Sequence, residues 1–448
     1  MRKTLFVILC VFQLQAQDLS LSKSDTRSTS TEKRQLTGTQ SGQPSGRSER
    51  WRIRRLEKRK KRVVLQPSRF QNWLIHLESR GFESLVGYKD FHARLGDITT
   101  GSGLSPEVRY WKPAIKGSPL TFQGSATYSI RQYQNYSFQF GKNPSRQDFI
   151  FWPNISGRST LQLDEPQPQA RTFFLYTDFH YRDLPQEDFF GLGPHSKESD
   201  RTDFRFTNVT YDAVSGYRFN TWLTASTRLG YMKVDVRPGE DDNYFDTQTV
   251  FTDSTTPGLN HQPDLLHWSA SVRIDLRDRP GNPHRGGLLG LSFSRFDDRG
   301  GDHFTFTRFA SDARYFMTLG SEQRVMAFRF FTSLNDEVGK SRIPFYLQET
   351  LGGNNTLRGF RSFRFRGENL LFLSFEYRWE ASPVLELALF FDQGKVFQRR
   401  ADFDLKSLER GFGVGLRLKT LQSVLMRLDL ARSREHGLRL HFKFGHSF

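Results

Sequence analysis

Large apolar side chains alternate with polar ones along most of the chain that follows residue 88. Between residues 411 and 419, for example, Phe412, Val414 and Leu416 alternate with Gly413, Gly415 and Arg417. Residues 171–182 and 424–430 repeat this alternation. A period of two residues gives a β-strand one apolar face and one polar face. The pattern predicts a long series of such strands. They are expected near 89–97, 104–112, 119–130, 133–141, 170–183, 202–213, 218–235, 264–277, 286–297, 302–316, 322–334, 368–380, 383–393, 410–420, 422–433 and 436–447.

Composition decides which way the apolar faces point. The 448 residues are 36% hydrophobic and 14% aromatic, with 43 Phe and a mean hydropathy of −0.60. These values describe a thin apolar band with many aromatic rings at its borders, as in a barrel that faces lipid. A soluble β protein of this length would divide into domains with visible linkers. We therefore predict an all-β fold for residues 89–448, a transmembrane antiparallel β-barrel with its polar face toward the lumen.

The first residues have the composition of a secretory signal peptide. Residues 1–17 combine Arg2 and Lys3 with a short apolar core and the small Ala16 near the end. Cys10 is the one cysteine and lies within this segment, so the mature chain carries no thiol that could be oxidised. We expect the protein to be exported.

A basic tail follows the signal. Residues 18–67 are predicted to be disordered, first Ser/Thr-rich and then strongly basic, because they offer almost no apolar surface to bury. Residues 47–62 hold ten Lys and Arg against two Glu, which is +8 of the formal net charge of +17. Such a run fits outer-membrane lipid, unfolded outer-membrane proteins or a periplasmic factor as partners. The signal peptide argues against nucleic acid.

An amphipathic helix is expected over residues 68–88. Phe70, Trp73, Leu74 and Leu77 fall on one helical face. An aromatic face beside a basic run is typical of a helix that lies on a membrane surface. A helix packed in the barrel mouth would show the same periodicity, so both placements stay open.

The most informative stretch is 343–377. Gly352, Gly353 and Gly359 can adopt positive φ or bring backbones close together, and would hold a loop in a folded-back shape. Arg358 lies between apolar Leu357 and Phe360, an unusual place for a solvated loop residue. Its planar fork of donors suits a carboxylate that can accept two hydrogen bonds.

This stretch resembles the signature of the BamA/TamA-type outer-membrane barrel assembly and two-partner secretion superfamily, also called the bacterial surface antigen family. The matching loop residues are Gly352, Gly353, Leu357, Arg358, Gly359 and Phe360. The resemblance implies a sixteen-stranded barrel whose long loop folds into the lumen. It also implies that Arg358 pairs there with Glu376 and Asp392. Members carry POTRA domains before the barrel, and residues 18–87 show no pattern of one.

The C-terminal strand is similar to the signal that assembly machinery recognises on outer-membrane substrates. Apolar residues alternate up to a terminal Phe. The residues of this expected signal are Gly437, Leu440, Phe442, Phe444 and Phe448. Such a strand supports a location in the bacterial outer membrane, with the N-terminal tail in the periplasm.

No motif predicts catalysis. The sequence lacks a nucleophile elbow, a paired-His zinc motif and a phosphate-binding loop, so we expect no enzyme activity, cofactor or metal. The resemblance implies outer-membrane protein assembly and insertion, or polypeptide translocation. The alternative is a structural or passive-pore barrel that keeps the fold without assembly activity.

Overall fold

A computed structural model describes residues 87–88, 90–96, 98–99, 101–112, 118–142, 171–301, 303–419, 424–435 and 437–444, all of them in the second of the two units of the chain, 73–448. Sixteen strands form one antiparallel sheet, which confirms the predicted fold class. They are β2 (Phe91–Gly96), β3 (Ser105–Lys112), β4 (Leu120–Tyr128), β5 (Gln134–Lys142), β6 (Thr172–Phe189), β7 (Thr202–Arg218), β8 (Leu223–Pro238), β10 (Asp264–Asp275), β11 (Gly286–Asp298), β12 (Phe306–Leu319), β13 (Ser321–Glu337), β16 (Asn369–Ser382), β17 (Leu385–Phe397), β18 (Glu409–Lys419), β19 (Val424–Ser433) and β20 (Leu438–Phe444).

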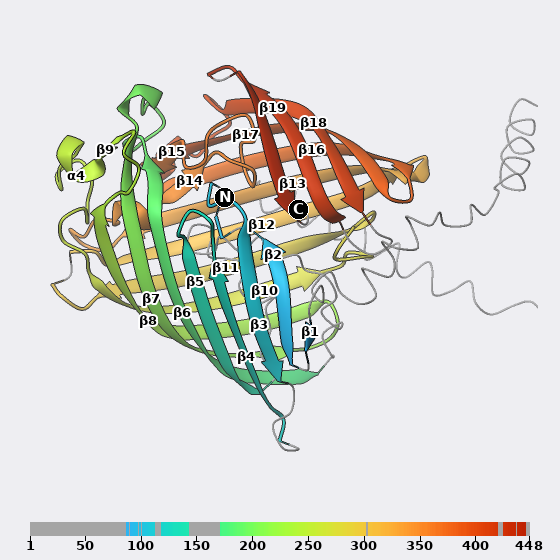
Figure 1. The fold of residues 1–448 in the computed structure, drawn as a ribbon, viewed down its shortest axis with the longest axis horizontal. Helices are drawn as coiled ribbons and strands as arrows, with labels where there is room; N and C mark the ends of the chain where they lie inside the picture. Colours follow the sequence, from blue (N-terminus) through green and yellow to red (C-terminus); the bar gives the residue numbers. More distant parts are fainter. Residues whose placement is uncertain are drawn as a thin grey trace, which may run out of the picture. The chain divides into compact units, whose positions relative to one another are not determined.

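Each of these strands pairs with the next along the chain, from β2 to β20. Figure 1 shows the sheet curving round, as a barrel wall does. The strands β4 and β5 are two separate strands joined by a tight turn, and the number of long strands is therefore even.

The remaining elements are short. They are β1 (Gly87–Tyr88), β9 (Phe245–Asp246), β14 (Glu349–Leu351), β15 (Phe365–Gly367), α4 (Thr247–Val250) and the 3-10 turns η4 (Glu198–Asp200), η5 (Phe345–Leu347) and η6 (Arg400–Asp402). Among the described residues, no helix is both long enough and apolar enough to cross a membrane.

One boundary of the expected helix over 68–88 is wrong. Gly87 and Tyr88 form β1, which pairs with the start of β2. The rest of that helix, the signal peptide, the basic tail and residues 143–170 lie outside the described residues.

The two faces of the sheet differ as the alternation predicts. On β17, Leu387 and Leu389 are exposed on the outer face, whereas Glu386, Ala388 and Asp392 are buried on the inner one. Charged side chains thus lie inside, where they can pair with one another, and apolar side chains face outward.

Connections at the two ends of the strands differ in length. Hairpins β12–β13 and β16–β17 turn within one or two residues at one end. At the other end, residues 239–263 and 338–368 form long loops. Outer-membrane barrels have short periplasmic turns and longer extracellular loops. Residues 338–368 are here called the long loop, and they lie at the end of the strands opposite to these short turns.

Candidate functional site

The long loop returns into the interior through a tight glycine turn. Gly352 and Gly353 have φ of 119° and 89°, a region that favours glycine. A Cβ at Gly352 would lie 2.0 Å from the carbonyl oxygen of Arg361. Thr356 closes the turn, because its hydroxyl accepts from the Gly352 amide at 3.0 Å. The turn presents Arg358 to the inner face of the sheet.

Arg358 makes a two-point contact with Asp392 of β17. Its Nε donates to Asp392 Oδ2 at 2.7 Å and its Nη2 donates to Oδ1 at 2.8 Å. Its Nη1 donates to Glu376 Oε2 of β16 at 3.0 Å. The guanidinium carbon lies 3.5 Å from the centre of the Phe390 ring, and Arg358 is 2% exposed. The structure therefore places both sequence-named carboxylates on the one guanidinium.

Ion pairs extend this contact into a network of eight buried side chains. Glu376 also pairs with Arg378 and Arg417 at 2.7 and 2.8 Å. Asp429 of β19 lies 3.5 Å from Arg358 and 3.0 Å from Arg427. The members are the carboxylates of Glu376, Glu386, Asp392 and Asp429 and the guanidinium groups of Arg358, Arg378, Arg417 and Arg427.

Charge balance in this network depends on the loop. Seven of the eight residues belong to the strands β16–β19, and only Arg358 comes from the loop. When the loop is seated, four carboxylates face four guanidinium groups. When the loop is withdrawn, the same four carboxylates face only three guanidinium groups. A buried charge without a partner is costly, so the strands alone hold an uncompensated carboxylate that Arg358 neutralises.

Arg358 is a permanent charge. Burial alone would lower the pKa of Arg358, but Asp392, Glu376 and Asp429 raise it by more, so the net pKa lies above its ordinary value. The loop therefore brings a cation to this site at every physiological pH.

Glycines on β18 make room for the loop. A Cβ at Gly411 would lie 3.1 Å from the amide nitrogen of Gly359 in the loop. Gly413 acts on the loop only indirectly, because its added Cβ would lie 2.5 Å from the Phe390 ring against which Arg358 packs. On the loop side, a Cβ at Gly359 would lie 2.8 Å from both the carbonyl oxygen of Arg432 and Cβ of Ser433. Gly359 is thus required because the loop backbone lies close to β19, and not because its φ is positive.

Cations from several strands hold the tip of the loop. Arg427 of β19 donates to the Asn354 carbonyl at 2.6 Å, and Arg329 of β13 donates to the Asn355 carbonyl at 3.3 Å. Lys443 of β20 donates to the Asn355 side chain. The tip is therefore held from both sides of the β16–β18 segment.

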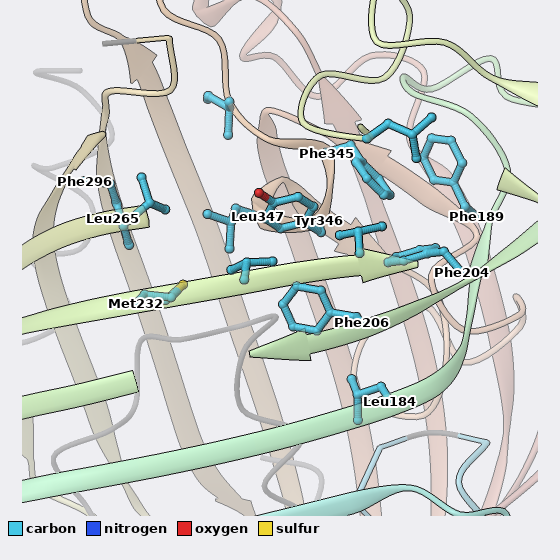
Figure 2. Close-up of a cluster of buried hydrophobic side chains, with 14 of the residues drawn as sticks. Leu184, Phe189, Phe204, Phe206, Met232, Leu265, Phe296, Phe345, Tyr346 and Leu347 are labelled. Atoms are coloured by element: carbon cyan, nitrogen blue, oxygen red, sulfur yellow. The ribbon is translucent and has the colours of Figure 1, made fainter. Parts of the chain in front are cut away.

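The start of the long loop packs on a different part of the sheet. Figure 2 shows Phe345 and Tyr346 among side chains of β6, β7 and β8, including Phe204 and Phe206. Ring centres of Phe345 and Phe204 lie 4.9 Å apart, and those of Tyr346 and Phe206 lie 5.6 Å apart. Phe345 is fully buried. Apolar packing thus anchors one end of the loop and ion pairs anchor its tip.

Leu357 and Phe360 flank Arg358 with buried apolar contacts. Both are fully buried in a cluster that includes Phe365 of β15 and Phe372 of β16. Burial of this size on either side of the cation excludes water from its ion pairs, which strengthens them.

The C-terminal strand β20 places Leu440 and Phe442 on the exposed outer face. Gly437 precedes the strand, with no atom within 4 Å of an added Cβ. The side chain of Phe444 and residue Phe448 lie outside the described residues. Leu440 and Phe442 thus lie on the face of the sheet opposite to the buried Arg358 network, as a separate feature.

Five network members were not anticipated from the sequence: Arg378, Glu386, Arg417, Arg427 and Asp429. Each is a charged residue on the polar face of a strand whose other face is apolar, as Asp429 between Leu428 and Leu430. The alternation therefore shows from the sequence that these charges face the lumen, but it does not show which of them form ion pairs. Among the described residues, no group of three or more His, Cys, Asp or Glu could hold a metal ion.

Comparisons with known proteins agree with this fold. The structure is similar to BamA from Haemophilus ducreyi lacking POTRA domains 1-3, with a TM-score of 0.57 and 16% identity over 79% of this chain and 69% of that one. CdiB from Escherichia coli matches 79% of this chain and 61% of its own at 12% identity, with a TM-score of 0.48.

A probable outer membrane protein, pmp20 of Chlamydia pneumoniae, is 36% identical over 110 residues, which are 23% of this chain and 6% of that protein. Because the match covers so short a part of that protein, no activity is inferred from it for this chain. The model of the Omp85 superfamily domain matches residues 104–448. That match covers well over half of the sequence, and the chain belongs to the Omp85 superfamily.

Proposed function

We propose that this outer-membrane barrel inserts proteins into the outer membrane or translocates polypeptide across it. Membership of the Omp85 superfamily and a fold similar to BamA support this class of function. They do not distinguish insertion from translocation. The client is an unfolded outer-membrane protein or another exported polypeptide.

The observation that carries the proposal is the double anchoring of the long loop. Its start packs against β6–β8 and its tip binds β16–β19, so the loop passes through the interior between these two parts of the sheet. A passive pore needs an open lumen at rest. A buried, charge-balanced loop in that lumen favours a barrel that changes state during its work, because the network is costly to break and specific when complete.

We place the N-terminal tail in the periplasm. Sixteen strands return the chain to the side where it started. That side carries the one- and two-residue turns of β12–β13 and β16–β17, together with the longer connection between β5 and β6. The basic run at 47–62 would then face anionic lipid, a periplasmic factor or an unfolded client. As part of the same proposal, the protein acts without enzymatic chemistry.

Deletion in the native host tests the function. We expect loss of a defined set of outer-membrane or secreted proteins from the deletion strain, with the lipid inventory unchanged. Restoration by the wild-type gene and not by an Arg358→Ala gene would link the loss to the loop. Purified protein should show little steady conductance in planar bilayers. A large open conductance with an unchanged protein inventory would instead support the passive pore.

A further inference from the structure

Three arginines follow the Arg358 turn in close succession, Arg361, Arg364 and Arg366. Arg361 Nε donates to Glu198 Oε1 at 2.7 Å, and Arg366 Nη2 donates to Glu187 Oε1 at 2.7 Å. Both carboxylates belong to the β6–β7 hairpin. The return of the long loop is therefore tied to a hairpin that lies early in the strand order.

Arg364 differs from its two neighbours because it joins two hairpins. Its Nη1 and Nη2 donate to Ser196 Oγ and Ser196 O at 2.9 and 2.7 Å, on the β6–β7 loop. Its Nε donates to Glu435 Oε1 at 3.1 Å, and Nη2 donates to the same oxygen. Glu435 lies in the turn between β19 and β20. Arg364 thus links the hairpin of β6 and β7 to the hairpin of β19 and β20.

The terminal hairpin β19–β20 has further contacts with the long loop. Arg427 and Lys443 of this hairpin hold the loop tip, as described above. His441 of β20 bonds through Nε2 to the Arg358 carbonyl oxygen at 2.6 Å. The loop therefore lies along the inner face of the hairpin, from the interior to its extracellular turn.

We propose that Arg364 is the positioning residue that couples the seating of the long loop to the closed position of the terminal hairpin. When the loop is seated, Arg364 holds the β19–β20 turn against the β6–β7 loop. When the hairpin moves outward, Arg364 loses Glu435 while it keeps Ser196. Movement of the last two strands and release of the loop are then one linked equilibrium.

The chemistry of the contact supports this role. Arg364 is 2% exposed, and its guanidinium lies 4.5 Å from the Phe365 ring centre and 5.3 Å from that of Phe190. The cation is thus fixed in place by the loop and the β6–β7 side. The Glu435 side chain is 30% exposed. Separation of Glu435 would leave the buried arginine without this carboxylate, so a seated loop favours the hairpin position in which the two are paired.

Hydrogen–deuterium exchange on the purified full-length barrel tests the coupling without reference to insertion activity. Glu435→Gln removes the charge on the hairpin and leaves the Ser196 contacts of Arg364 in place. We expect exchange at the amides of 434–444 to become roughly tenfold faster, the size expected for loss of a charge-assisted hydrogen bond. Exchange in the loop near 354–360 should rise with it.

Arg361→Ala is the matched control. It removes an arginine of the same segment whose hydrogen bond goes to Glu198 of the β6–β7 loop and not to the hairpin, so it should accelerate exchange at 434–444 far less than Glu435→Gln does. Arg364→Ala should match Glu435→Gln at the hairpin, and the double variant should add little. Heat-modifiability on gels reports that each variant is folded.

Two results would overturn the proposal. One is unchanged exchange at 434–444 in folded Glu435→Gln protein. The other is an equal acceleration by Arg361→Ala, which would mean that the loop as a whole, and not Arg364, holds the hairpin. Neither result bears on whether the protein inserts or translocates clients, which the deletion strain decides separately.

Discussion

Arg358 and Asp392 form a two-point guanidinium–carboxylate contact across 34 residues of sequence, with both nitrogen–oxygen distances below 3 Å. The Arg358 backbone amide also donates to Asp392 Oδ2 at 3.3 Å. One carboxylate therefore fixes the side chain and the backbone of the loop turn together. This geometry needs a planar fork, which lysine does not have.

Arg358→Ala should release the loop. It leaves Asp392 buried without the cation that binds it and takes one of three cations from Glu376, at a cost of about 3–5 kcal/mol. Arg358→Lys keeps the charge but loses the fork, so it should recover only part of the stability. Both losses should appear as faster protease cleavage near Thr356 and as a lower unfolding midpoint.

Arg399→Ala serves as the surface control for this pair. Its side chain is 79% exposed and its ion pair with Asp402 is solvated, so removal should change stability by well under about 1 kcal/mol. Wild-type protease resistance in Arg358→Ala protein would mean that apolar packing alone seats the loop.

Asp392→Asn should give a milder version of the same effect. The amide keeps one acceptor for the guanidinium but removes a charge, and the loss of a charge-assisted bond costs about 1.5–3 kcal/mol. With Arg358→Ala the network regains charge balance, so the double variant should be clearly less destabilised than the sum of the single ones. Strict additivity in unfolding measurements would show that the two residues do not act as a pair.

Gly359→Ala should unseat the turn without touching any charge. Its Cβ would press on the Arg432 carbonyl and on Ser433 at 2.8 Å, an overpacking that costs about 1–3 kcal/mol. Gly437→Ala is the matched control, because nothing lies within 4 Å of its added Cβ. Protease sensitivity near Thr356 should rise in the first variant and stay at the wild-type level in the second.

The strands were predictable because a period of two residues is a local signal. Predicted and observed bounds agree within a few residues for short strands, as at 104–112 against Ser105–Lys112. They differ most for β6, predicted over 170–183 and observed to Phe189. The last residues of β6 lie beyond the apolar band, so the alternation of apolar and polar residues ends there, whereas the hydrogen bonding to β7 continues.

The site was predictable only in part. Arg358, Glu376 and Asp392 were named through resemblance to a family, and the structure places them together. The contact of Arg364 with Glu435 depends on how the loop folds across the sheet, because 71 residues separate the two. No period or spacing in the sequence encodes such a contact.

The base of the long loop carries a pH-dependent group, Glu368, which precedes β16. Burial and the neighbouring charge of Glu337 raise the pKa of Glu368 from 4.5 to about 7, although Arg342 lowers it somewhat. The folded loop thus favours the protonated form of this carboxyl. The contribution of Glu368 to the stability of the seated loop is fully present below pH 4.5, where the carboxyl is protonated in the released loop too. This contribution is lost as the pH rises toward 7.

Glu368→Gln should remove this dependence. The amide stays neutral at every pH, so the variant should match wild type below pH 4.5 and resist protease better than wild type above pH 7. Comparing the two proteins at each pH cancels the protease's own pH dependence. Asp404→Asn is the control, since that carboxyl is half-exposed and its pKa is lowered, first by the hydrogen bond from Lys395. If wild type and Glu368→Gln differ equally at all pH values, the carboxyl titrates outside this window and another group sets the stability of the loop base.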